Sequence, residues 1–192
     1  VTKDNNFKNF IRRRPLGVVF VIAPWNYPYL TAVNSIIPAM AAGNTVILKH
    51  SAQTPLCAEQ LYKSAEKTLP KDVFNYLHLN HKDGLKIVSD SRINFVSFTG
   101  SVKAGYEVQK ATHTKFIDMA LELGGKDPAY ARFDCDLDKT VENLVDGSFF
   151  NSGQSCCGIE RIYVDEKIYD KFLESFISKT YNYKFGNPLE KE

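Results

Sequence analysis

Short apolar runs rich in β-branched residues alternate with amphipathic segments along the first two thirds of the chain. A compact apolar run is typical of a buried strand, whereas apolar residues spaced three and four apart indicate a helix. The pattern predicts strands at residues 16–23, 45–49, 73–79, 93–98 and 116–121, with helices at 29–42, 55–69, 82–89 and 101–112 between them. Strands separated by helical crossovers predict an α/β fold with a doubly wound, mostly parallel, Rossmann-like sheet.

Local signals mark several of the boundaries. Gly43-Asn44 ends the first predicted helix, and Thr54-Pro55 supplies a capping hydroxyl and a first-turn proline for the second. In doubly wound sheets, ligands bind beyond the carboxyl ends of the strands. Because Asn26, Lys49 and the Thr99-Gly100-Ser101 turn lie at the ends of predicted strands, we expect them to converge at one edge of the sheet.

The pattern changes after Gly124-Gly125. Beyond this pair, strands are expected at residues 127–133 and 161–164, and helices at 137–150 and 167–183. These elements are too few for a complete domain.

Composition narrows the class of protein. The 192 residues are 44% hydrophobic and 24% charged with a net charge of +2, so no nucleic-acid partner is expected, and the cluster Arg12-Arg13-Arg14 is interpreted as a solvated segment. No apolar run approaches the roughly 18–20 residues of a membrane span. The start at Val1, without an initiator methionine or a signal-type apolar stretch, indicates a trimmed chain. Four cysteines without disulfide or metal-site spacing predict no metal and a reducing, cytoplasmic compartment.

A cysteine is the strongest candidate for chemistry. It lies in the run Phe150-Asn151-Ser152-Gly153-Gln154-Ser155-Cys156-Cys157. The small, polar residues before Cys156 favour an exposed thiol at a turn that approaches a helix start, where the helix dipole lowers a thiol pKa and raises the thiolate fraction. From the residues alone, the alternative is that both cysteines are small, buried hydrophobic side chains.

A carboxylate and an amide are the next candidates. Glu122 lies between Leu121 and Leu123, an apolar setting that is expected to raise the carboxylate pKa toward the range of a general base. The alternative is a strand-end carboxylate that faces water or pairs with a lysine. Asn26 can donate its side-chain N–H to a developing oxyanion, or it forms only a turn with Pro28.

Two further features suit a phosphate-containing ligand. The run Phe98-Thr99-Gly100-Ser101 predicts a strand, a turn and a helix start, where free N–H groups and the helix dipole can bind a pyrophosphate. An ordinary serine cap gives the same pattern. Lys49 ends a predicted strand and is either a ligand-binding residue or a surface lysine with a solvated ammonium group.

Together these runs resemble the aldehyde dehydrogenase superfamily, from about residue 14 to residue 189. The run at 150–157 is similar to the nucleophile motif of that family. The run Leu121-Glu122-Leu123-Gly124-Gly125-Lys126 is similar to its general-base motif, and Pro24-Trp25-Asn26-Tyr27-Pro28 resembles its oxyanion-binding run.

The resemblance implies a role for each candidate. Cys156 would attack an aldehyde carbon, and Asn26 would hold the resulting oxyanion together with the backbone N–H of Cys156. Hydride transfer would leave a thioester, which Glu122 would hydrolyse to a carboxylic acid by activating water. Tyr27 and Phe150 would line the substrate tunnel.

The implied cofactor is NAD or NADP. Many NAD-preferring relatives carry a glutamate three residues after the ribose-binding lysine, where this chain has Ala52, so acceptance of a 2′-phosphate is expected to be possible. The cofactor-binding residues implied by the resemblance are Lys49, Trp25, Gly100, Ser101, Gly105 and Ser51.

The resemblance also implies a domain plan. Residues 1–13 would be the end of a linker or oligomerisation hairpin, 14–123 a dinucleotide-binding domain, and 124–192 the first part of an α/β catalytic domain. The glutamate and phenylalanine that position the nicotinamide ribose in the family would lie beyond this chain, so these residues alone are expected to be inactive. The parent protein would be a homodimer or homotetramer.

Three alternative functions remain open. A CoA-acylating or phosphorylating relative would pass the acyl group to an acceptor other than water, although such enzymes generally lack the glutamate found at Glu122. A Cys–His hydrolase would need one of the four histidines to pair with Cys156. A non-catalytic binding or structural protein derived from the same fold is the third alternative.

Overall fold

The computed structural model describes residues 3–4, 7–187 and 189–190. The chain divides into two compact units, Val1–Leu123 and Gly124–Glu192. The first unit has two hydrophobic clusters, one on each side of a sheet, and the second unit has a cluster of its own.

The first unit is built on a five-stranded parallel sheet with the order β5-β4-β3-β6-β7. Its strands are β3 (Val18–Ala23), β4 (Thr45–His50), β5 (Phe74–Tyr76), β6 (Ile93–Thr99) and β7 (Asp118–Glu122). From β3 the chain winds first to β4 and β5, and then returns to β6 and β7 on the other side. This reversal defines a doubly wound sheet with its switch point between β3 and β6. The predicted fold class is confirmed.

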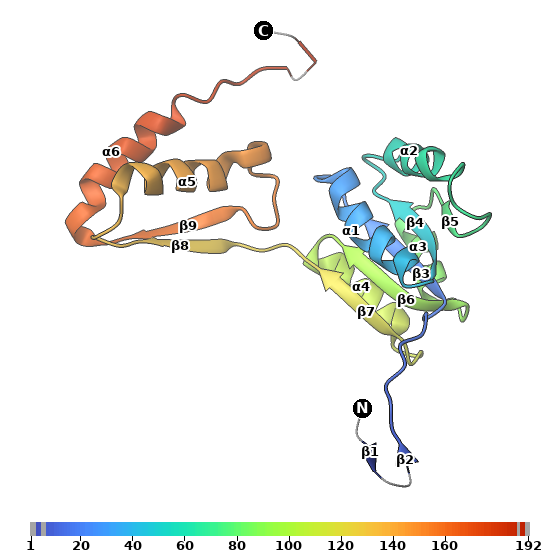
Figure 1. Cartoon of the computed structure of the whole chain (residues 1–192). Coiled ribbons are helices and arrows are strands. Elements are labelled where there is room, and N and C mark those ends of the chain that lie inside the picture. The colour runs from blue at the N-terminus through green and yellow to red at the C-terminus, as the bar shows by residue number, and fades with distance from the viewer. Residues whose placement is uncertain (1–2, 5–6, 188, 191–192) are drawn as a thin grey trace. The chain divides into compact units, whose positions relative to one another are not determined.

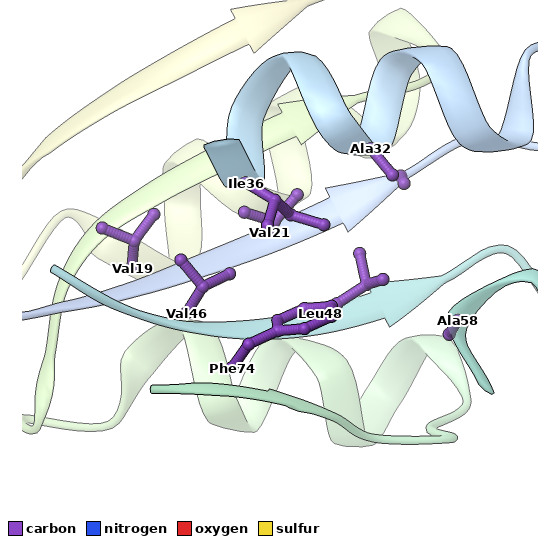
Figure 2. Packing of buried hydrophobic residues seen from close by; sticks show 9 residues of the cluster. Val19, Val21, Ala32, Ile36, Val46, Leu48, Ala58 and Phe74 are labelled. Carbon is purple, nitrogen blue, oxygen red and sulfur yellow. The ribbon is translucent and has the colours of Figure 1, made fainter. Parts of the chain in front are cut away.

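Helices cover both faces of this sheet (Figure 1). On one face α1 (Pro28–Ala41) and α2 (Leu56–Ala65) pack on a cluster that includes Val21, Leu48 and Ile36, and Figure 2 shows how these side chains meet. On the other face α3 (His81–Ser89) and α4 (Val102–Thr112) pack on a cluster around Phe20 and Val96. Because successive residues of a strand point to opposite faces, the apolar run of β3 supplies both clusters.

A buried asparagine connects the end of α1 to the start of the central strand. Asn44 follows Gly43, whose positive φ of 87° ends the helix as the sequence predicts. The Asn44 side-chain oxygen accepts hydrogen bonds from the N–H groups of Leu16 at 2.7 Å and Gly17 at 3.0 Å, and its amide donates to the Ala39 carbonyl at 2.9 Å. These bonds fix where β3 begins.

The second helix differs from its prediction at both ends. It begins at Leu56 and ends at Ala65, and Thr54 does not cap it. The Thr54 hydroxyl lies 3.0 Å from Nδ1 of His50, so it is engaged by the imidazole ring rather than by the helix N–H groups. After Ala65 the chain continues in turns to Leu69.

The second unit contains a parallel strand pair, β8 (Asp127–Ala131) and β9 (Ile159–Val164), with two helices packed on it (Figure 1). The helices α5 (Leu137–Phe149) and α6 (Tyr169–Thr180) bury Val141, Val145 and Phe172. Short 3-10 turns η1 (Phe150–Gly153) and η2 (Glu166–Ile168) precede β9 and α6, respectively. The predicted closing helix therefore starts later than residue 167. At the other end of the chain, β1 (Lys3–Asp4) pairs antiparallel with β2 (Phe7–Lys8).

Candidate functional site

Polar candidates of the first unit gather at the carboxyl edge of its sheet. The strand register pairs Ile22 with both Lys49 and Phe98, and Thr99 with Glu122. The Gly100 N–H donates to the Glu122 carbonyl at 2.9 Å, which ties the turn after β6 to the end of β7. The convergence that the sequence predicts at this edge is therefore present.

The segment between β3 and α1 carries Trp25, Asn26 and Tyr27. Trp25 is 43% exposed, whereas Asn26 and Tyr27 are partly buried. The Tyr27 carbonyl accepts hydrogen bonds from the Thr31 N–H at 3.1 Å and the Thr31 hydroxyl at 2.7 Å. These bonds anchor the segment to the first turn of α1 and leave the Trp25 ring accessible to a ligand.

Lys49 is buried, with only 4% of its surface exposed. Its methylene groups lie beside Gly84 of α3, and its ammonium group donates to the His50 carbonyl at 3.2 Å. Burial lowers the pKa of Lys49 from its usual value of 10.5. Among the residues that the structure describes, no carboxylate forms an ion pair with it. The alternative of a solvated surface lysine is wrong.

The turn after β6 presents the start of α4. The Ser101 side chain is exposed and accepts a hydrogen bond from the Ala104 N–H at 3.2 Å, so it caps the helix. Gly105 lies one turn further on and is buried. A Cβ atom at this position would lie 2.7 Å from a methyl group of Leu123, so the glycine provides close packing of α4 on the sheet. The loop after β4 carries the partly buried Ser51 and the exposed Ala52.

Glu122 does not have the apolar surroundings that its flanking leucines predicted. It is exposed at the end of β7, where exposed and partly buried residues alternate. Because neighbouring residues of a strand point to opposite faces, Leu121 and Leu123 pack on the α3–α4 side of the sheet. The carboxylate therefore faces away from them.

Cys156 lies in a turn before β9, and no helix starts there, contrary to the expectation from its sequence. The turn follows three residues with positive φ: Asn151 at 51°, Ser152 at 57° and Gly153 at 72°. These three left-handed residues lie within η1, and the chain then passes through the cysteine turn into β9. Because a strand, and not a helix, follows Cys156, the helix dipole that the sequence predicts beside this thiol is not found there.

The two adjacent cysteines differ in their contacts. Both are exposed, so the alternative of small buried hydrophobic side chains is wrong. The Cys157 thiol lies 3.2 Å from the Ser155 hydroxyl and forms a hydrogen bond with it. Phe150, at the start of the same loop, is also exposed.

Gly125 contacts the backbone of the cysteine turn. A Cβ atom on Gly125 would lie 2.6 Å from the Cys156 carbonyl oxygen, whereas a Cβ atom on Gly124 would meet nothing within 4 Å. Pairing of Asp127 with Ile159 brings the two segments together. The sequence indicated this glycine pair as part of the general-base motif and as a domain marker, but it did not predict the close approach of Gly125 to Cys156.

Sequence reasoning also missed His50. The ring is buried and is held between three partners: Nε2 lies 2.9 Å from the Pro28 carbonyl, and Nδ1 lies 3.0 Å from both the Ser51 N–H and the Thr54 hydroxyl. Burial lowers the pKa of His50 from 6.5, so the ring is neutral at pH 7. No sequence motif identifies it, because its partners are mostly backbone groups.

In the described ranges, no group of three or more metal-ligand side chains is found. No helix there combines the length and hydrophobicity that crossing a bilayer requires.

A doubly wound parallel sheet with a helix start and polar side chains at its carboxyl edge is the architecture of the Rossmann-like, nucleotide-binding folds. The sequence pattern of the aldehyde dehydrogenase family matches residues 1–192, and the chain belongs to that family.

Relatives with assigned activities are similar over nearly all of this chain. It is 36% identical to D-glyceraldehyde dehydrogenase (NADP(+)) of Picrophilus torridus, over 96% of this chain and 38% of the relative. It is 40% identical to lactaldehyde dehydrogenase of Methanocaldococcus jannaschii, over 95% of this chain and 40% of the relative. The chain thus spans about two fifths of their length.

A solved structure of an aldehyde dehydrogenase is similar to this chain in both fold and sequence. The NAD-dependent aldehyde dehydrogenase of Sinorhizobium meliloti has a TM-score of 0.89 and 32% identity, covering 92% of this chain and 36% of its own.

Replacement of the two glycines separates a contact with the Cys156 turn from a general effect of glycine loss. Gly125→Ala should lower the turnover of the full-length enzyme by about tenfold to a hundredfold, because the Cys156 backbone must shift to admit the new methyl group. Gly124→Ala is the matched control and should retain wild-type turnover. Steady-state rates at saturating substrate check this, and equal rates for the two variants would contradict it.

Proposed function

We propose that this chain is the cofactor-binding and nucleophile-bearing portion of an enzyme that oxidises an aldehyde to a carboxylic acid with NAD or NADP. The observation that carries the proposal is the exposed Cys156 in a turn whose sequence resembles the family nucleophile motif. The first unit adds the other groups that the reaction requires: an amide at Asn26 and a carboxylate at Glu122, both at one sheet edge.

In the proposed reaction, the Cys156 thiolate forms a bond to the aldehyde carbon and produces a thiohemiacetal. The side-chain N–H of Asn26 and the backbone N–H of Cys156 donate hydrogen bonds to its oxyanion. NAD or NADP, held at the sheet edge, would supply the acceptor for the hydride that leaves this carbon. Glu122 then removes a proton from water as the water attacks the thioester, and the Cys156 thiolate leaves.

The residues at the sheet edge fit a dinucleotide. The N–H groups at the start of α4 next to Gly100 and Ser101 can bind a pyrophosphate, aided by the helix dipole. The exposed ring of Trp25 can contact the cofactor. Gly105 would support this site through its packing on Leu123 rather than through direct contact.

The ribose end of this site favours a 2′-phosphate. A buried ammonium group without a carboxylate partner is costly, and an anion within reach of Lys49 would relieve that cost. Ser51 and Ala52 follow in the next loop, and neither carries a negative charge that would repel a phosphate. We therefore propose that NADP is accepted and preferred over NAD.

Small aldehydes are the proposed substrates, since the relatives are named for glyceraldehyde and lactaldehyde. Tyr27 and Phe150 are the proposed wall residues of the substrate tunnel.

The second unit is proposed to belong to a larger catalytic domain. One face of its β8–β9 pair leaves Tyr130 and Tyr163 exposed, whereas parallel sheets are usually covered on both faces. Activity then requires residues beyond this chain, and a homodimer or homotetramer remains a prediction.

The competing functions have less support. Glu122 favours water over coenzyme A or phosphate as the acyl acceptor, because a hydrolytic reaction needs a base. A Cys–His hydrolase needs a histidine for the thiol, but no sequence motif pairs Cys156 with His50, His78, His81 or His113. Three of these rings, those of His50, His78 and His113, bond to groups within the first unit. A non-catalytic binding or structural protein derived from the same fold would also match the family, but the presence of Cys156, Glu122 and Asn26 argues for a catalytic parent.

The role of the nucleophile is tested with the two adjacent cysteines. Cys156→Ala in the full-length enzyme should abolish aldehyde oxidation, because no thiohemiacetal can form, while the Kd for the dinucleotide stays unchanged. Cys157→Ala is the control with the neighbouring thiol removed and should remain active. Reduced-cofactor formation followed by absorbance provides the measurement. Turnover by the Cys156→Ala variant would remove it as the nucleophile.

Glu122→Gln separates the two chemical steps. The variant should release one equivalent of reduced cofactor in a rapid burst and then stall, since the thioester forms but its hydrolysis lacks a base. The steady-state rate should fall by about a hundredfold or more, as expected for loss of a general base. Stopped-flow absorbance measures both phases. A normal steady-state rate would show that another group activates the water.

Cofactor preference is tested at Ala52. Ala52→Glu adds a carboxylate in the loop after Lys49, and it should weaken NADP binding by about tenfold or more through repulsion of the 2′-phosphate. Ala52→Gln has a similar shape without the charge and should keep the preference for NADP. Calorimetric titration with NADP and NAD gives the two Kd values for each protein, and an unchanged ratio in Ala52→Glu would contradict the proposed ribose site.

A further inference from the structure

His50 occupies a distinctive place at the carboxyl edge of the first unit. It is the last residue of β4, it pairs with Ala23 in the sheet register, and it is only 4% exposed. Strand alternation sends the side chains of Lys49 and His50 to opposite faces. Lys49 lies against α3, whereas the His50 ring points toward α1.

The three contacts of the ring define its protonation state. The Ser51 N–H can only donate, so Nδ1 must accept and the proton must lie on Nε2. Nε2 then donates to the Pro28 carbonyl at 2.9 Å, and the Thr54 hydroxyl donates to Nδ1 at 3.0 Å. In this neutral tautomer Nε2 donates one hydrogen bond, and the Ser51 and Thr54 donors share the single lone pair of Nδ1. The lowered pKa of the ring agrees with that state.

These contacts join two loops that have different proposed functions. Pro28 begins α1 and lies two residues after Asn26, so the bond to its carbonyl holds the carboxyl end of the segment that presents the amide. Ser51 and Thr54 belong to the loop after β4, which carries the proposed ribose contacts. The imidazole therefore acts as a bridge between the oxyanion side and the ribose side of the edge.

We propose that His50 is a positioning residue whose Nε2 bond to Pro28 sets the place of Asn26, and whose Nδ1 bonds set the ribose-binding loop. This inference rests on the proposed function for the roles of the two loops. The contacts themselves lie within one compact unit. If His50 had only a structural role, every substitution of His50 would lower the stability of the fold, and kcat and dinucleotide affinity would fall together.

Two amide substitutions test the two sides of the ring separately. Asn can place an oxygen near the position of Nδ1 but does not reach Pro28, whereas Gln can place an N–H donor near the position of Nε2. His50→Asn should keep the Kd for the dinucleotide and lower kcat by about tenfold, the effect expected for loss of one buried hydrogen bond. His50→Gln should keep kcat and raise that Kd several-fold.

The experiment uses the full-length enzyme, with kcat from steady-state rates and the Kd for NADP from calorimetry. Thr54→Val removes only the hydroxyl bond to Nδ1 and should follow His50→Gln with a smaller rise in Kd. The midpoint of thermal unfolding is recorded for every variant. Opposite patterns in the Asn and Gln variants at similar unfolding midpoints would support the positioning role.

Other outcomes overturn it. If the two amide variants lose kcat and NADP affinity in parallel with their unfolding midpoints, His50 is a structural residue only. An unchanged Kd in His50→Gln also contradicts the proposal. If the wild-type enzyme binds NADP but oxidises no aldehyde, the proposed function fails. The calorimetric comparison of the Gln and Asn variants still decides the inference about the ribose-binding loop.

Discussion

The parallel pairing of β3 with β4 on one side and with β6 on the other is the constraint on which the first unit depends. Phe20 and Val21 are both buried and point to opposite faces, so one strand anchors both helical layers. Because all five strands run in the same direction, their carboxyl ends meet at one edge. Each candidate residue of this unit lies near that edge because it ends or follows one of these strands.

Two polar side chains at this edge, Lys49 and His50, are buried where β4 ends, and each needs a partner. His50 finds three within the fold and so connects two loops. Lys49 donates to a single carbonyl, and no carboxylate of the described residues forms an ion pair with it, so its ammonium group is buried without a counter-charge. In the second unit, the close approach of Gly125 to the Cys156 carbonyl restricts the backbone of the turn that carries the proposed nucleophile.

Much of this arrangement could be predicted from the sequence, because buried parallel strands appear as apolar runs and their ends mark the binding edge. The departures have local physical causes. Glu122 is exposed because its flanking leucines lie on the other face of β7. Cys156 precedes a strand because Asn151 and Ser152 adopt left-handed conformations that no residue pattern announces. His50 was missed because its ring bonds to the carbonyl of Pro28, a residue 22 positions away in the sequence.

If Cys156 carries the acyl group during aldehyde oxidation, as we propose, acid-quenched single-turnover mass spectrometry will detect it there. The full-length enzyme is mixed with lactaldehyde and NADP, quenched within one turnover, digested and sequenced by fragmentation. We expect an acyl adduct on Cys156, not on Cys157, that forms only when both aldehyde and oxidised cofactor are present. An adduct on another residue, or acid production without any adduct that depends on the cofactor, would contradict it.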